Sequence, residues 1–213
     1  AHLVDAFCDS DGAILVEDGF ITNVFAGFLL PSIFNDFLKN KTEIKLIDCK
    51  GLTLMPSFVD MHAHFRYPGQ PQKEELDSAL KAAVAGGFGT LMLMPNTVPV
   101  VSTAEEAHNV QLKSSQFELA DVIQSISITS AFDGKTTKHL DNLDSALHPV
   151  ISEDGHDVSS SSVMFEAMKK CAKNNILVSC HCEDVSFAEA AQIPRKNAIT
   201  LLNEEKNLTN STN

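Results

Sequence analysis

Strand-like and helix-like patterns alternate from Leu52 onward, and this rhythm limits the possible folds more than any other feature of the sequence. Apolar, strand-like segments occupy 52–65, 89–96, 121–129, 149–155 and 176–184. Between them lie stretches with helical spacing at 73–85, 103–116, 139–148 and 160–174. Such alternation predicts an α/β fold, a parallel sheet with helices outside, either doubly wound or a (β/α)8 TIM-like barrel.

The polar residues that follow the strands favour the barrel. His62, His64, Asn96, Asp154 and His181 all come at the carboxyl end of a predicted strand. In a barrel these ends converge on one mouth, where active sites of that fold lie. A complete barrel needs eight strands and about 250 residues. We therefore expect residues 56–213 to hold about the first five strands of a partial barrel.

Residues 1–55 have a different pattern, with short apolar runs broken by turn signals. Asp18-Gly19 lies between two alternating runs and predicts a β-hairpin. Both ends of the chain look cut, so we expect a fragment of a longer protein with a small β-rich region at its start. Further along, Ser102 and Glu105 are spaced as a capping box for the helix that follows.

Composition excludes some classes of partner. A net charge of -12 and a pI near 5.0 argue against binding nucleic acid or an anionic membrane surface. An anionic substrate would need a local positive site. The five cysteines form an odd set without a disulfide-framework spacing, which indicates reduced thiols and a cytoplasmic location. No apolar run is long enough to span a membrane.

His62 and His64 form the first candidate metal site. Side chains at i and i+2 of a strand share a face, so both imidazoles would point into the barrel while Ala63 points toward the helices. Two neutral imidazoles on one face can bind a single Zn²⁺. The motif alone is weak evidence for a metal site, because two histidines that bind no metal on a partly exposed strand end would give the same sequence pattern.

Cys180, His181 and Cys182 offer a rival metal site. On a regular strand the cysteines share one face and His181 takes the other, so the three cannot bind one ion. We expect His181 to face the mouth and the cysteines to pack under the helices as small apolar residues.

A carboxylate could join the histidines into a two-metal site. Alternation places Glu153 and Asp154 on opposite sides, so only one faces the barrel centre. A carboxylate there can bridge two ions, one held by His62 and His64 and the other by His181. The competing interpretation of Asp154 is a turn residue.

Arg66 and Asn96 are candidates for binding the substrate. The planar fork of Arg66 suits a carboxylate, and Asn96 is the first polar side chain after an apolar strand. The alternatives are an arginine paired with a surface acid and an asparagine that makes a turn.

Four motifs in order, "DMHAHFRYPGQ" (60–70), "MPNT" (94–97), "SEDG" (152–155) and "HCED" (181–184), resemble the dihydroorotases of the amidohydrolase superfamily. The resemblance is to the long bacterial-type class, in which an aspartate bridges the metals. It implies that His62 and His64 bind a first zinc, that Asp154 bridges, and that His181 binds a second zinc. It also implies that Arg66 and Asn96 bind the substrate carboxylate.

The implied activity is the reversible hydrolysis of dihydroorotate to N-carbamoyl-L-aspartate in pyrimidine synthesis. Residues 1–55 would then be part of the family's β-sandwich. A homodimer or a complex with aspartate transcarbamoylase is a possible assembly. Tyr67 stands where the family commonly has glutamate, which we consider harmless.

A second-metal histidine and the acid/base aspartate of the family would lie beyond Asn213, so we expect the fragment alone to be inactive. The alternatives are a hydantoinase-like or allantoinase-like hydrolase, or a catalytically silent partner subunit.

Overall fold

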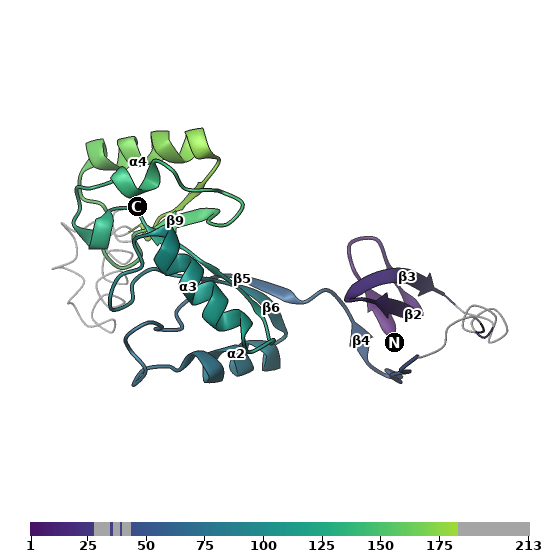
Figure 1. Cartoon of the computed structure of the whole chain (residues 1–213). Coiled ribbons are helices and arrows are strands. Elements are labelled where there is room, and N and C mark those ends of the chain that lie inside the picture. Colours follow the sequence, from purple (N-terminus) through teal and green to yellow (C-terminus); the bar gives the residue numbers. More distant parts are fainter. Residues whose placement is uncertain (28–34, 36–38, 40–43, 183–213) are drawn as a thin grey trace, which may run out of the picture. The chain divides into compact units, whose positions relative to one another are not determined.

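The computed structural model describes residues 1–27, 35, 39 and 44–182, and the chain divides into two compact units, Ala1–Ser57 and Phe58–Asn213 (Figure 1). Each unit is described by itself below. Among the described helices, none is both long and apolar enough to cross a membrane. All five cysteines lie in the described ranges and are free thiols, as their spacing predicted.

The first unit contains one small sheet with the strand order β3-β2-β1-β4. The strands are β1 (His2–Val4), β2 (Asp9–Glu17), β3 (Phe20–Ala26) and β4 (Thr53–Leu54). The predicted hairpin is confirmed: β2 and β3 pair antiparallel across Asp18 and Gly19, whose φ values are 51° and 83°. Aspartate and glycine tolerate this left-handed region, which a two-residue hairpin turn requires.

The second unit contains parallel strands arranged in chain order. The strands are β5 (Phe58–Ala63), β6 (Phe88–Leu93), β7 (Asp121–Gln124), β8 (Ile126–Ser127), β9 (Val150–Ser152) and β10 (Leu177–Ser179). The sheet orders are β5-β6-β7 and β8-β9-β10. Only Ser125 separates β7 from β8, so one stretch of chain pairs first with β6 and then with β9. The predicted α/β alternation is confirmed, and within each of the two sheets the strands lie side by side in the order of the sequence.

Three helices pack against the sheets: α2 (Leu76–Ala85), α3 (Ala104–Ser115) and α4 (Ser161–Asn174), and Figure 1 shows α3 running along the sheet that contains β5 and β6. In α2 the buried positions Leu76, Ala79, Leu80 and Ala83 recur with the period of one helix face. They join Leu91 and other buried apolar side chains in the main core between helices and strands.

The helix predicted for 139–148 is wrong. The chain there forms only a 3₁₀ turn, Lys138–Leu140, followed by further turns. The Asp144 carboxylate accepts a hydrogen bond from the Ala146 backbone N–H at 2.9 Å. Short polar side chains that bond to the nearby backbone offer it an alternative to the helix.

The capping box lies one residue later than predicted. Thr103 caps α3, and its partner is Glu106 rather than Glu105. Ser102 is buried, and its hydroxyl accepts hydrogen bonds from the Ala131 N–H at 2.8 Å and the Ser127 hydroxyl at 3.0 Å. Ser102 therefore ties the start of α3 to the end of β8.

Candidate metal centre

Strand β5 and the residue that follows it present His62 and His64 on one face of the sheet. The side chains between and after them, Ala63 and Phe65, pack on the opposite face in the core that the helices cover. Ala63 lies beside Leu93 in the register, and Leu93 also faces the helices. The alternation of side chains along a strand accounts for this arrangement, as the sequence predicted.

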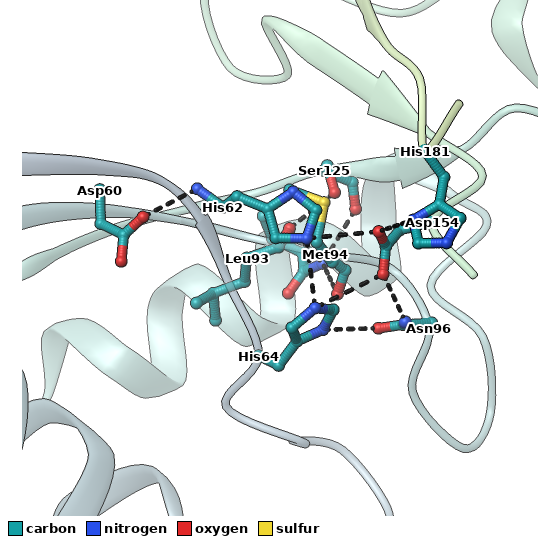
Figure 2. Close-up of polar contacts among 10 residues, drawn as sticks. Asp60, His62, His64, Leu93, Met94, Asn96, Ser125, Asp154 and His181 are labelled. Atoms are coloured by element: carbon teal, nitrogen blue, oxygen red, sulfur yellow. Dashed lines mark hydrogen bonds and ion pairs between the residues drawn. The ribbon is translucent and has the colours of Figure 1, made fainter. Parts of the chain in front are cut away.

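Three side chains bring metal-binding atoms together at this face (Figure 2). The Nε2 atoms of His62 and His64 lie 3.2 Å apart. The Asp154 carboxylate lies 3.3 Å from His62 Nε2 through Oδ1 and 3.5 Å from His64 Nε2 through Oδ2. Bonds of about 2.0–2.2 Å to a tetrahedral zinc separate its ligand atoms by about 3.3–3.6 Å. The observed spacing fits such an ion.

The chemistry of these atoms also fits a cation. An ionised carboxylate offers only lone pairs, and a neutral imidazole offers one. Burial, with a further contribution from the Arg66 charge, lowers the pKa of His64 below its ordinary value of 6.5. A neutral imidazole is the form that binds metal. Asp154 is nearly buried, with 5% of its side chain exposed. A positively charged partner would therefore strongly stabilise the ionised carboxylate, because a buried charge without a partner is costly.

His181 completes the cluster from the other side of Asp154. Its Nδ1 lies 3.1 Å from Asp154 Oδ1, the same oxygen that faces His62. Asp154 therefore stands between the His62 and His64 pair and His181. A carboxylate in this position can serve two neighbouring ions.

Asn96 belongs to the same cluster, whereas Arg66 does not contact it. Asn96 Oδ1 lies 3.0 Å from His64 Nδ1, and Asn96 Nδ2 donates to Asp154 at 2.7 Å. Within the described ranges the Arg66 side chain makes no hydrogen bond or ion pair to these residues. It lines a cavity of about 450 Å³ next to α2, together with Tyr67. The positive charge of Arg66 still acts on His64, because it helps to lower the pKa of that imidazole.

Glu153 points away from the cluster and forms hydrogen bonds with Thr129, which lies just after β8. It is 2% exposed and accepts the Thr129 backbone N–H at 2.9 Å as well as the Thr129 hydroxyl. Burial raises the pKa of this carboxyl. The sequence predicted that Glu153 and Asp154 face opposite ways, but it gave no sign of the partner at Thr129.

The prediction that Cys180 and Cys182 pack under the helices is wrong, because both are exposed. Strand β10 ends at Ser179, and Cys182 has a left-handed φ of 62°. The alternation that would bury the cysteines therefore stops before it reaches them. The neighbouring Glu183 and Asp184 of the same motif lie outside the described residues.

Sequence reasoning also missed the role of Gly69. A Cβ on Gly69 would lie 1.5 Å from the backbone oxygen of Val98. The loop that carries Arg66 therefore lies directly against the loop that carries Asn96. Pro-Gly pairs are typical of turns, but only the fold shows what Gly69 touches.

Comparison with known proteins decides the family. The sequence model described as Dihydro-orotase-like matches residues 51–196. The chain belongs to this dihydroorotase-like family. The matched region contains His62, His64, Asn96, Asp154 and His181.

Curated relatives in the dihydroorotase-like family are similar along most of the chain. The dihydroorotase of Clostridium botulinum is 37% identical over 206 residues, which is 96% of this chain and 49% of that protein. The dihydroorotase of Aquifex aeolicus is 35% identical over 175 residues, 82% of this chain and 39% of that protein. The chain thus spans half or less of the length of these relatives.

Among solved structures, the L-hydantoinase (dihydropyrimidinase) of Arthrobacter aurescens has a similar fold. Its TM-score is 0.64 at 19% identity, covering 92% of this chain and 42% of that one. At this identity the likeness concerns the fold alone. This similarity is in keeping with the α/β fold of this dihydroorotase-like chain.

Proposed function

We propose that the full-length protein is a dihydroorotase, which reversibly hydrolyses the cyclic amide of dihydroorotate to N-carbamoyl-L-aspartate in pyrimidine synthesis. The observation that carries the proposal is the convergence of His62, His64 and Asp154 within the region matched by the family model. The two relatives compared above are both named dihydroorotase.

Two zinc ions are part of the proposal. His62 and His64 would hold the first ion, Asp154 would bridge, and His181 would help to hold the second. Zinc, when bound, polarises the amide carbonyl and lowers the pKa of a water molecule. The protein's own part is to present imidazole nitrogens and one nearly buried carboxylate at a spacing that suits the first ion.

Arg66 and Asn96 are proposed to bind the substrate carboxylate. The protein carries a net charge of -12, so an anionic substrate requires a local cation near the site. Arg66 follows the metal-binding histidines and its charge reaches His64. A guanidinium binds a carboxylate through two parallel hydrogen bonds, which fixes the substrate's orientation.

The architecture of the whole protein is proposed on the same basis. Strands β5 to β10 follow each other in chain order, which fits the first part of a barrel, and residues 1–55 would contribute to a β-sandwich. We propose a cytoplasmic enzyme, since all five thiols are free. A homodimer or a complex with aspartate transcarbamoylase would be the assembly to look for.

Hydrolysis of dihydroorotate by the full-length protein tests the proposal, with zinc content measured on the same samples. The wild type should turn over, His62→Ala should lose zinc and activity, and Arg66→Ala should keep zinc but show a raised KM. Hydantoin and allantoin are the comparison substrates. A protein that binds zinc and hydrolyses one of these instead, or none of the three, refutes the dihydroorotase assignment.

A further inference from the structure

The side chain of Asn96 joins two of the proposed metal ligands. Its Oδ1 lies 3.0 Å from His64 Nδ1 and its Nδ2 lies 2.7 Å from Asp154 Oδ2. Figure 2 shows the amide between the two side chains, beside the cluster. Asn96 comes from the loop after β6, whereas His64 follows β5 and Asp154 follows β9. One amide therefore links the ends of three strands.

The chemistry of the partners fixes which way the amide faces. An ionised Asp154 only accepts hydrogen bonds, so it must face the NH₂ group of Asn96. The amide oxygen then faces His64 and needs a donor, which Nδ1–H of the imidazole supplies. A neutral imidazole with its proton on Nδ1 has its lone pair on Nε2. That Nε2 is the atom that faces His62 and Asp154.

We propose that Asn96 is a positioning residue of the metal centre, which sets the tautomer of His64 and the orientation of Asp154 before any substrate binds. The inference deepens the proposed function and rests on its metal site. This role of Asn96 leaves room for a contact with the substrate, because one N–H of its Nδ2 and one lone pair of its Oδ1 remain available for hydrogen bonds. Hydrogen bonds of this kind orient metal ligands and raise their basicity.

The backbone around Asn96 is built to hold the amide in place. Pro95 is buried, and its carbonyl accepts the N–H groups of Thr97 at 2.8 Å and Val101 at 3.1 Å. On the other side, a Cβ on Gly155 would lie 3.6 Å from Asn96 Nδ2. The turn that follows Asp154 therefore packs against the Asn96 amide, which also donates a hydrogen bond to Asp154.

Zinc affinity without substrate is the measurement that tests this role. Full-length wild type, Asn96→Ala and Asn109→Ala would be titrated with zinc against a competing chelator. Asn109 is an exposed asparagine on α3, so it is the matched control. Asn96→Ala should bind zinc about 10- to 100-fold more weakly, the usual effect of losing such a partner. Asn109→Ala should bind zinc like the wild type.

Nitrogen NMR of histidine in the zinc-free protein gives a second readout that a general loss of stability would not mimic. The wild type should hold the His64 proton on Nδ1, and Asn96→Ala should lose this preference. Asn96→Asp keeps an acceptor oxygen toward His64, so it should retain the preference.

The outcomes separate the inference from the proposed function. If Asn96→Ala binds zinc as tightly as the wild type and only its KM rises, Asn96 serves the substrate alone and the inference is wrong. If the zinc and NMR results hold but dihydroorotate is not hydrolysed, the inference stands and the substrate assignment fails. A wild type that binds no zinc overturns the metal site and the inference together.

Discussion

Replacing Gly69 by alanine should damage the site through the contact between two loops. The alanine Cβ would lie 1.5 Å from the Val98 backbone oxygen, whereas real Cβ atoms essentially never come closer than 3.0 Å. The loops that carry Arg66 and Asn96 must therefore move apart by about 1.5 Å. Because a misplacement of about 1 Å can cost about 10²-fold in rate, kcat/KM for dihydroorotate should fall by about that factor.

Gly51→Ala is the control for this experiment. Gly51 and Gly69 have similar left-handed φ values, 78° and 91°, but a Cβ on Gly51 would meet nothing within 4 Å. Both variants should lose about 1–2 kcal/mol of stability from the strained backbone, measured by urea unfolding. Only Gly69→Ala should lose activity. A Gly69→Ala protein with kcat/KM within twofold of the wild type would refute the idea that this contact positions the site.

Three further predictions concern stability and are measured by unfolding of the full-length protein in denaturant. Leu80→Ala empties a fully buried position on α2 and should cost about 3–5 kcal/mol; a loss below about 1 kcal/mol would contradict the packing. Glu153→Ala leaves the buried Thr129 N–H unpaired and should cost about 1–3 kcal/mol, whereas exposed Glu105→Ala should cost little. Burial lowers the pKa of His148 below 6.5, so the unfolded chain binds the extra proton and stability falls as pH drops through 6.5. His148→Gln should flatten this slope, and an unchanged slope would contradict it.

Local rules explain why part of the site could be predicted. Side chains two apart on a strand share a face wherever the strand lies, so the common direction of His62 and His64 follows from the sequence. Asp18-Gly19 specifies its hairpin for the same local reason, because the turn needs two residues that tolerate positive φ. The motifs around these residues also indicate the family without reference to the tertiary structure.

Local rules also failed where a competing interaction was not visible in the sequence. The stretch 139–148 has helical spacing, but the Asp144 carboxylate bonds to the backbone and the chain forms turns. Serine is a residue type that commonly caps helices, yet the fold buries Ser102, where it accepts a hydrogen bond from Ser127. The exposure of Cys180 and Cys182 depends on β10 ending at Ser179, and no residue nearby marks that end.

The sequence by itself determined which residue types stand at the strand ends, which of them share a strand face, and the family to which they belong. Only the tertiary structure decided that Asn96 meets Asp154, 58 residues away, and His64, 32 residues away, through the two ends of one amide. The reason is physical. Side-chain direction along a strand is a local property of the backbone, whereas a contact between strand ends depends on how neighbouring strands are ordered and in which register they pair.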